Sequence, residues 1–137
     1  MYPALRRFLG EGWVSKKAVP GERGQTRQQY VITPEGRRHL IERLSEFSEG
    51  DAVSEGAFRL RVGLFPALRP EVRETILAAR EKELHRRDAA LKSLQTNLDL
   101  GKFGGEIVRY MRKQIGMEFE WIRHLRRIAK TIVVRDN

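Results

Sequence analysis

Histidines, cysteines and paired carboxylates most often carry catalysis or bind metals, and this sequence offers little of that kind. The three histidines, His39, His85 and His124, are far apart and fall on three different predicted helices, without a metal-ligand partner at a recognised spacing. The chain has no cysteine, which excludes a disulfide framework, a thiolate nucleophile and a cysteine-based zinc site. We therefore expect no metal, no cofactor and no enzymatic activity.

Two further groups of residues have ordinary structural explanations. Glu81, Glu83 and Asp88 lie on a predicted helix with alternating charges, which is typical of a solvated face. The run at 101–105, Gly-Lys-Phe-Gly-Gly, lacks the spacing and the Ser or Thr of a phosphate-binding loop. We interpret it as a turn between helices.

Basic residues are the chemically informative group. The chain has 27 Lys and Arg against 18 Asp and Glu, a formal charge of +9, so it is attracted to polyanions such as nucleic acid or an acidic membrane surface. Its apolar runs fall far short of the roughly 20 residues that a membrane span needs, and the amino end lacks an apolar core of signal-peptide length. We expect a cytoplasmic protein without a membrane partner.

The first predicted helix, residues 1–11, separates a cationic face from an apolar one. Leu5 and Phe8 share the apolar side. Residues four apart share a helix face, and the opposite side carries two such pairs, Tyr2 with Arg6 and Pro3 with Arg7. That side is available to a nucleic acid while the apolar side packs into a core.

A β-hairpin is predicted after this helix. An extended stretch begins at Trp13, which we expect in the core, a polar loop spans 15–28, and residues 29–32 form the second strand. The loop carries Lys16, Lys17, Arg23 and Arg27 against one acidic residue, Glu22. This charge pattern is typical of a hairpin that contacts phosphates, although a solvated basic loop explains it equally well.

The predicted elements give a mainly α, α+β fold with three parts. Residues 1–47 form a partial winged helix-turn-helix, made of a recognition helix, a hairpin wing and a helix that Thr33 caps and Pro34 begins. Residues 48–56, with two glycines and two serines among acidic residues, are expected to be a connector. Residues 57–137 form a helical dimerisation domain, in which helices 71–100 and 106–133 run antiparallel.

Two motifs resemble the PadR family of bacterial transcriptional regulators. They are Tyr2-Pro3-Ala4-Leu5-Arg6-Arg7 with Glu11-Gly12-Trp13-Val14, and Gly24-Gln25-Thr26-Arg27-Gln28-Gln29-Tyr30-Val31-Ile32-Thr33-Pro34-Glu35-Gly36-Arg37. The first is similar to the family's recognition helix and first wing strand, the second to its wing and following helix; together they cover the first third of the chain. The resemblance implies a repressor that binds a palindromic double-stranded DNA operator as a homodimer and is released by a small effector.

The resemblance also implies roles for single residues. Tyr2, Pro3 and Arg6 would lie at the groove, and Arg7, Arg23 and Arg27 near phosphates. Family members have two further helices before the recognition helix, so we expect a truncated form, a late start or a degraded gene. The alternative function is therefore a helical interaction protein that dimerises with a partner and does not itself bind DNA.

Apolar rows predict the dimer interface. One is a row of leucines every seven residues, which is a coiled-coil pattern. Arg80 and Arg87 occupy the positions between the leucines where a coiled coil needs a second apolar row. Packing inside a helical bundle is therefore favoured over a free zipper. The last helix carries a broader apolar face, which suits a subunit interface. The predicted interface comprises Leu77, Leu84, Leu91, Leu98, Val108, Met111, Ile115, Ile122 and Leu125.

Aromatic residues on the last helix are the candidates for effector binding. Some PadR-like proteins bind flat aromatic effectors near aromatic residues of this interface, which implies a role for Tyr110, Phe119 and Trp121 by location. The alternative is that these three side chains are interface core or partly exposed aromatics.

Overall fold

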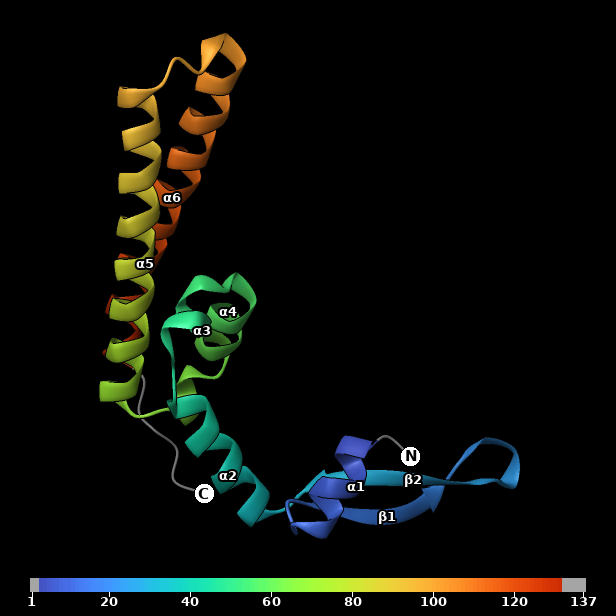
Figure 1. Ribbon diagram of the computed structural model, residues 1–137. Helices are drawn as coiled ribbons and strands as arrows, with labels where there is room; N and C mark the ends of the chain where they lie inside the picture. The colour runs from blue at the N-terminus through green and yellow to red at the C-terminus, as the bar shows by residue number, and fades with distance from the viewer. Residues whose placement is uncertain (1–2, 132–137) are drawn as a thin grey trace. The chain divides into compact units, whose positions relative to one another are not determined.

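The computed structural model describes residues 3–131 and divides into two compact units, 1–46 and 47–137 (Figure 1). The first unit holds a two-stranded antiparallel sheet between two helices, and the second is entirely helical over the residues described. This is the predicted fold class: mainly α, with the helix, hairpin and helix of a partial winged helix followed by two long helices.

In the first unit, helix α1 (Pro3–Gly10) leads into the hairpin. Gly12, with φ +77°, follows the helix, and the N–H of Trp13 donates to the Phe8 carbonyl at 2.9 Å. Strands β1 (Val14–Pro20) and β2 (Thr26–Ile32) pair in full, with a 3-10 turn η1 (Glu22–Gly24) at the tip. The predicted loop at 15–28 is thus wrong in extent. Most of its side chains are polar and its few apolar ones, such as Ala18 and Val19, are adjacent, so the alternation of apolar residues that marks a strand is missing while the backbone still pairs.

Helix α2 (Pro34–Ser45) is fixed to the base of the hairpin by its cap. The Thr33 hydroxyl accepts from the N–H of Gly36 at 2.9 Å and donates to the carbonyl of Gly12 at 2.6 Å, which confirms the predicted cap. Gly36 is buried against the Trp13 backbone, where a Cβ would collide with the Trp13 carbonyl group. Only glycine allows this approach.

The first unit has a thin apolar core. No residue of α1 is buried, and Leu5 and Phe8, which we expected in the core, are only half-buried. Trp13 is also half-buried: its ring stacks on His39 with centroids 3.8 Å apart and lies 5.7 Å from the Phe8 ring. Within the unit α1 rests mainly on β1, which is too narrow to cover a helix.

The second unit begins with short helices where the sequence predicts a connector. Helix α3 (Glu49–Val53) starts at a capping box in which Ser48 and Asp51 bond each other's backbone N–H, and α4 (Glu55–Gly63) follows with Ser54 as its cap. Ala52 of α3 is buried. The glycines and serines of 48–56 therefore mark helix starts rather than an unstructured link.

The long helices are α5 (Pro70–Asn97), which follows the 3-10 turn η2 (Phe65–Ala67), and α6 (Gly101–Ala129), and they lie side by side in Figure 1. The glycines at 101–105, predicted as a turn, belong to the start of α6. Asp99 accepts from the N–H of Gly101 at 3.0 Å, and Gly101 has φ +68°, so residues 98–100 alone reverse the chain.

Apolar side chains and ion pairs together hold α5 and α6 antiparallel. The buried apolar side chains are Ile76, Leu77, Leu84, Leu91, Val108, Ile115, Ile122 and Ala129. Asp88 pairs with Arg112 at 2.9 Å, and Arg126 reaches both Glu74 and Glu81 from the other end. The hydrogen bond from Arg126 holds the pKa of Glu81 below its usual value although burial opposes this.

Replacing Gly36 or Gly116 by alanine is expected to change stability in opposite directions. Gly36→Ala is expected to destabilise the first unit by about 2 kcal/mol or more, because the new methyl group meets backbone. Gly116→Ala, in the middle of α6 with open space at its Cβ, is expected to stabilise its helix by about 0.5–1 kcal/mol. Hydrogen exchange of β1, β2 and α6 amides measures both effects. Unchanged protection of the hairpin in Gly36→Ala would contradict the close approach.

Candidate functional site

The cationic face of α1 is exposed as predicted from its spacing. Pro3, Arg6 and Arg7 are all exposed, and the Arg7 guanidinium lies 5.7 Å from the centre of the Phe8 ring. Tyr2 lies outside the described residues. Because Leu5 and Phe8 turn toward β1, the two arginines remain open to solvent.

The hairpin distributes its predicted cations over two faces and a tip. Residues opposite each other in the register share a face and neighbours alternate. Lys17, opposite Gln29, therefore shares a face with Arg27, whereas Lys16 lies on the other face with Tyr30. Arg23 stands at the tip in a left-handed conformation, with φ 58°.

The predicted contact cations of α1 and the hairpin form no ion pair among the described residues. Over residues 3–131 the structure shows no ion pair for any member of the set Arg6, Arg7, Lys16, Lys17, Arg23 and Arg27, and all are exposed. An unpaired surface cation exchanges water and counterions for a phosphate at little cost. We call these exposed cations of α1 and the hairpin the cationic face. They form the candidate nucleic-acid interface.

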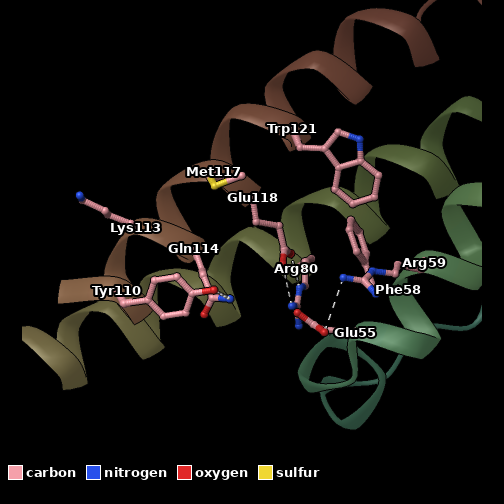
Figure 2. Close-up of a pocket in the computed structure, with 10 residues that line it drawn as sticks. All are labelled: Glu55, Phe58, Arg59, Arg80, Tyr110, Lys113, Gln114, Met117, Glu118 and Trp121. Carbon is pink, nitrogen blue, oxygen red and sulfur yellow. Dashed lines mark hydrogen bonds and ion pairs between the residues drawn. The ribbon is translucent and has the colours of Figure 1, made fainter. Parts of the chain in front are cut away.

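The second unit contains an open groove of about 470 Å³ between α4 and α6 (Figure 2). Phe58 is buried at its base and meets Trp121 edge to face, with ring centroids 5.9 Å apart. Tyr110 and Met117 continue the apolar wall along α6, and Lys113 adds a cation at the rim. Such a mixture suits a flat apolar ligand with an anionic group.

Arg80 of α5 holds the three elements that frame the groove. Its side chain is 1% exposed and binds Glu118 of α6 through two hydrogen bonds of 2.6 and 3.0 Å. It also donates to the Ala52 carbonyl at the end of α3 at 2.7 Å, and its guanidinium lies 5.6 Å from the Phe58 ring centre. Arg80 therefore links α5 to α6 and to the end of α3 directly beside the groove.

Only two of the three predicted effector residues come together. Tyr110 and Trp121 line the groove, whereas Phe119 points to another side of α6, where its ring lies 4.4 Å from His85 of α5. Phe58 and Met117 also line the groove but are not among the predicted effector residues. The contact of Phe58 with Trp121 is a tertiary one that no spacing in the sequence reveals.

Most of the predicted dimer interface belongs to the core of one chain. The side chains of Leu77, Leu84, Leu91, Val108, Ile115 and Ile122 are all buried. Side chains without exposed surface are not available to a partner subunit, so we revise this part of the prediction in favour of bundle packing. Leu98 and Met111 are exposed and Leu125 is intermediate.

A different apolar stripe of α6 is exposed. Its large members are 37–80% exposed and comprise Phe103, Ile107, Tyr110, Met117, Trp121 and Ile128. Their spacing of three, four and seven residues is visible in the sequence, but the prediction followed the more strongly apolar row through Val108 and Ile115. An exposed stripe of this size on a helix indicates a contact surface.

The described residues provide neither a metal site nor a membrane span. Among residues 3–131 no three His, Asp or Glu side chains come close enough to share a metal ion. No helix in the same range has the length and apolarity to cross a membrane.

Comparison with known proteins gives similarity to solved structures only. No protein-family model and no curated protein sequence matches the chain. The smu.1604c protein of Streptococcus mutans UA159 is 17% identical with a TM-score of 0.45, over 90% of this chain and 75% of that one. PadR of Bacillus subtilis, solved in complex with operator DNA, is 17% identical with a TM-score of 0.39, over 96% and 77%. At these values the likenesses by themselves assign no function.

Arg80 and Glu118 are tested by a pair of substitutions. Arg80→Met is expected to lower the free energy of unfolding of the second unit by about 3 kcal/mol, because it leaves a largely enclosed carboxylate and the Ala52 carbonyl without their donor. Adding Glu118→Met is expected to restore part of that loss. Urea unfolding followed by Trp121 fluorescence, with Trp13 replaced by Phe, measures both. A loss below about 1 kcal/mol in Arg80→Met would show that the pair is not structurally important.

Proposed function

We propose that this chain is a DNA-binding transcriptional regulator of the PadR type, and not an enzyme. The observation that carries the proposal is the cationic face: Arg6 and Arg7 on α1 and four hairpin cations are all exposed, and none has an ion pair within residues 3–131. The two sequence motifs that resemble the PadR family fall on α1, β1, β2 and the start of α2, which are the elements that carry this face.

In this proposal α1 enters the major groove and the hairpin follows the phosphate backbone. Arg6, exposed on α1, is suited to base edges, since arginine bonds guanine in two places at once. Lys17, Arg27 and the tip residue Arg23 are suited to phosphates, which position the protein without reading sequence. Binding of this kind blocks access to the DNA, and the regulator would act as a repressor.

The proposed regulator acts as a homodimer. The exposed stripe of α6 supports this, because covering each large apolar side chain contributes roughly 1.5–3 kcal/mol. A twofold dimer presents two copies of α1 to half-sites about 34 Å apart along the DNA, which requires a palindromic operator.

The groove between α4 and α6 is the proposed effector site. Trp121 and Tyr110 offer aromatic faces, Phe58 an apolar base and Lys113 a cation for an acidic group. A ligand there contacts Tyr110, Met117 and Trp121, which also belong to the exposed stripe, so it changes how the two subunits pair and thereby the spacing of the recognition helices.

DNA binding is tested by removing cations from the cationic face. Arg23→Gln with Arg27→Gln is expected to weaken binding to a 30-bp duplex of mixed sequence and to reduce the slope of log K against log salt by about 0.9 for each phosphate that the variant no longer neutralises. Fluorescence anisotropy over a salt series measures this. The matched control, Lys82→Gln with Lys92→Gln on α5, removes the same charge from exposed positions and is expected to leave the slope unchanged.

Selection from random duplexes then addresses the dimer and the alternative function. Enriched palindromes with half-sites about 10 bp apart are expected. Equal slopes for the two double variants would contradict the cationic face as the interface. A chain that dimerises but binds no duplex at low salt would instead be the interaction protein that the sequence leaves as the alternative.

Effector binding is tested with 2-naphthoate, a planar aromatic carboxylate. Trp121 fluorescence, read with Trp13 replaced by Phe, is expected to be quenched at micromolar to millimolar probe, and Tyr110→Ala is expected to weaken binding about tenfold or more. Phe119→Leu, outside the groove, is the matched control. Equal loss in both variants would remove the groove as the site.

A further inference from the structure

The exposed stripe of α6 follows a heptad pattern over its whole length. Its positions alternate spacings of four and three residues, which is the pattern of a coiled-coil seam. The seam consists of Phe103, Ile107, Tyr110, Gln114, Met117, Trp121, His124 and Ile128, and every member is exposed. The buried row through Val108 and Ile115 faces α5 on a different side of the same helix. Most of the seam is thus a second, exposed face of α6, although its Trp121 also meets Phe58 of α4 edge to face.

A row of charges accompanies the seam and alternates in sign. At seven-residue intervals, each one position before a seam residue, stand Glu106, Lys113, Glu120 and Arg127. All four are exposed. Over residues 3–131 only Glu106 has an ion pair, with Arg109 one turn further along its own helix. Charges at such flanking positions choose the partner, orientation and register of a coiled coil.

We propose that the seam of α6 packs antiparallel against the same seam of a second copy, in one register. This rests on the homodimer of the proposed function and specifies how it forms. In that register each seam residue faces a seam residue of the partner, in a ladder related by a twofold axis between residues 114 and 117. The layers are Phe103 with the partner's Ile128, Ile107 with the partner's His124, Tyr110 with the partner's Trp121, and Gln114 with the partner's Met117.

Charge complementarity selects this arrangement. Flanking positions of this kind face one another in an antiparallel pair, so Glu106 faces the partner's Arg127 and Lys113 faces the partner's Glu120, each contact occurring twice. Helical side chains lean toward the amino end of their own helix, which in opposed helices brings the two members of each contact together. All four contacts are attractive.

The same row of four charges disfavours the neighbouring registers. A shift of one heptad in one direction sets Lys113 against the partner's Arg127 and Glu120 against the partner's Glu120. A shift in the other direction sets Lys113 against the partner's Lys113 and Glu106 against the partner's Glu120. Every flanking contact is then between like charges, which is destabilising.

A parallel pair satisfies fewer of these groups. There Lys113 faces the partner's Glu118, but Glu118 is already bonded to Arg80 in its own chain. Gln114 would face Gln114 and His124 would face His124, and Glu106 and Glu120 would meet the apolar Met111 and Leu125. In the proposed antiparallel register each charge of the row faces an opposite charge of the partner.

Cysteine cross-linking tests the orientation, because the chain has no cysteine of its own. Chains with Ile107→Cys are mixed with differently tagged chains with His124→Cys, and Gln114→Cys is mixed in the same way with Met117→Cys. Disulfides between the two differently tagged chains are expected in both mixtures. In a parallel pair residues 107 and 124 lie about 25 Å apart at 1.5 Å per residue, beyond the roughly 7 Å that a disulfide spans between Cα atoms.

The outcomes separate this inference from the proposed function. A dimer that links only identical positions, 107 to 107 and 124 to 124, overturns the antiparallel seam and leaves the homodimeric regulator standing. A dimer that links neither overturns the α6 seam itself. A chain that is monomeric by light scattering at micromolar concentration overturns both.

Charge exchange tests the register. Lys113→Glu and Glu120→Lys, made singly, each turn two attractive contacts into repulsions and are expected to raise the dimer dissociation constant about tenfold. The double variant restores opposite charges and is expected to return near the original value, while Lys82→Glu on α5 controls for net charge. Additive losses in the double variant would overturn the proposed register.

Discussion

A row of arginines on α5 fixes the helical unit, and the rest of that unit depends on it. Arg73, Arg80 and Arg87 stand seven residues apart, and each donates to backbone carbonyls near the end of another element. Arg73 donates to the carbonyls of Phe65 and Ala129. Arg80 donates to those of Ala52 and Val53, and Arg87 donates to that of Val53. Arg80 and Arg87 also bind Glu118 and Glu83. The hydrogen bond from Arg86, with that from Arg87, holds the pKa of Glu83 at about 2 although burial acts to raise it. A buried cation requires such partners, so α3, α6 and η2 can occupy only the positions that supply them.

The two units therefore differ in whether the charge of their cations is neutralised within the fold. Many arginines of the helical unit, among them Arg80, Arg112 and Arg126, are engaged within the fold. The cations of α1 and the hairpin are exposed and form no ion pair with the part of the chain that the structure describes, so the charge that a polyanion meets there is not already neutralised. The apolar face of α6 that is not buried in the core is exposed, and its Tyr110, Met117 and Trp121 belong both to the groove and to the charged seam.

Sequence reasoning succeeded where local rules decide. The Thr33 cap and the two long helices follow from side-chain chemistry within a few residues. It failed where the deciding contact is distant in sequence. Arg80 and Arg87 looked like defects in a leucine zipper because their carbonyl partners lie 27–34 residues away. Phe119 and Trp121 looked alike because only the placement of α4 distinguishes the two sides of α6. The strands were drawn too short because a polar hairpin has no apolar alternation.

The central claim is that the chain meets DNA through α1 and the hairpin while the helical unit serves pairing. Hydrogen exchange of the chain with and without a 30-bp duplex at low salt tests this most directly, since α6 also carries exposed cations such as Lys113 and Arg127. Slower exchange in α1, β1 and β2 on adding DNA, with the middle of α6 unchanged, is the expected result. Slower exchange in α6 with α1 and the hairpin unchanged would contradict the account.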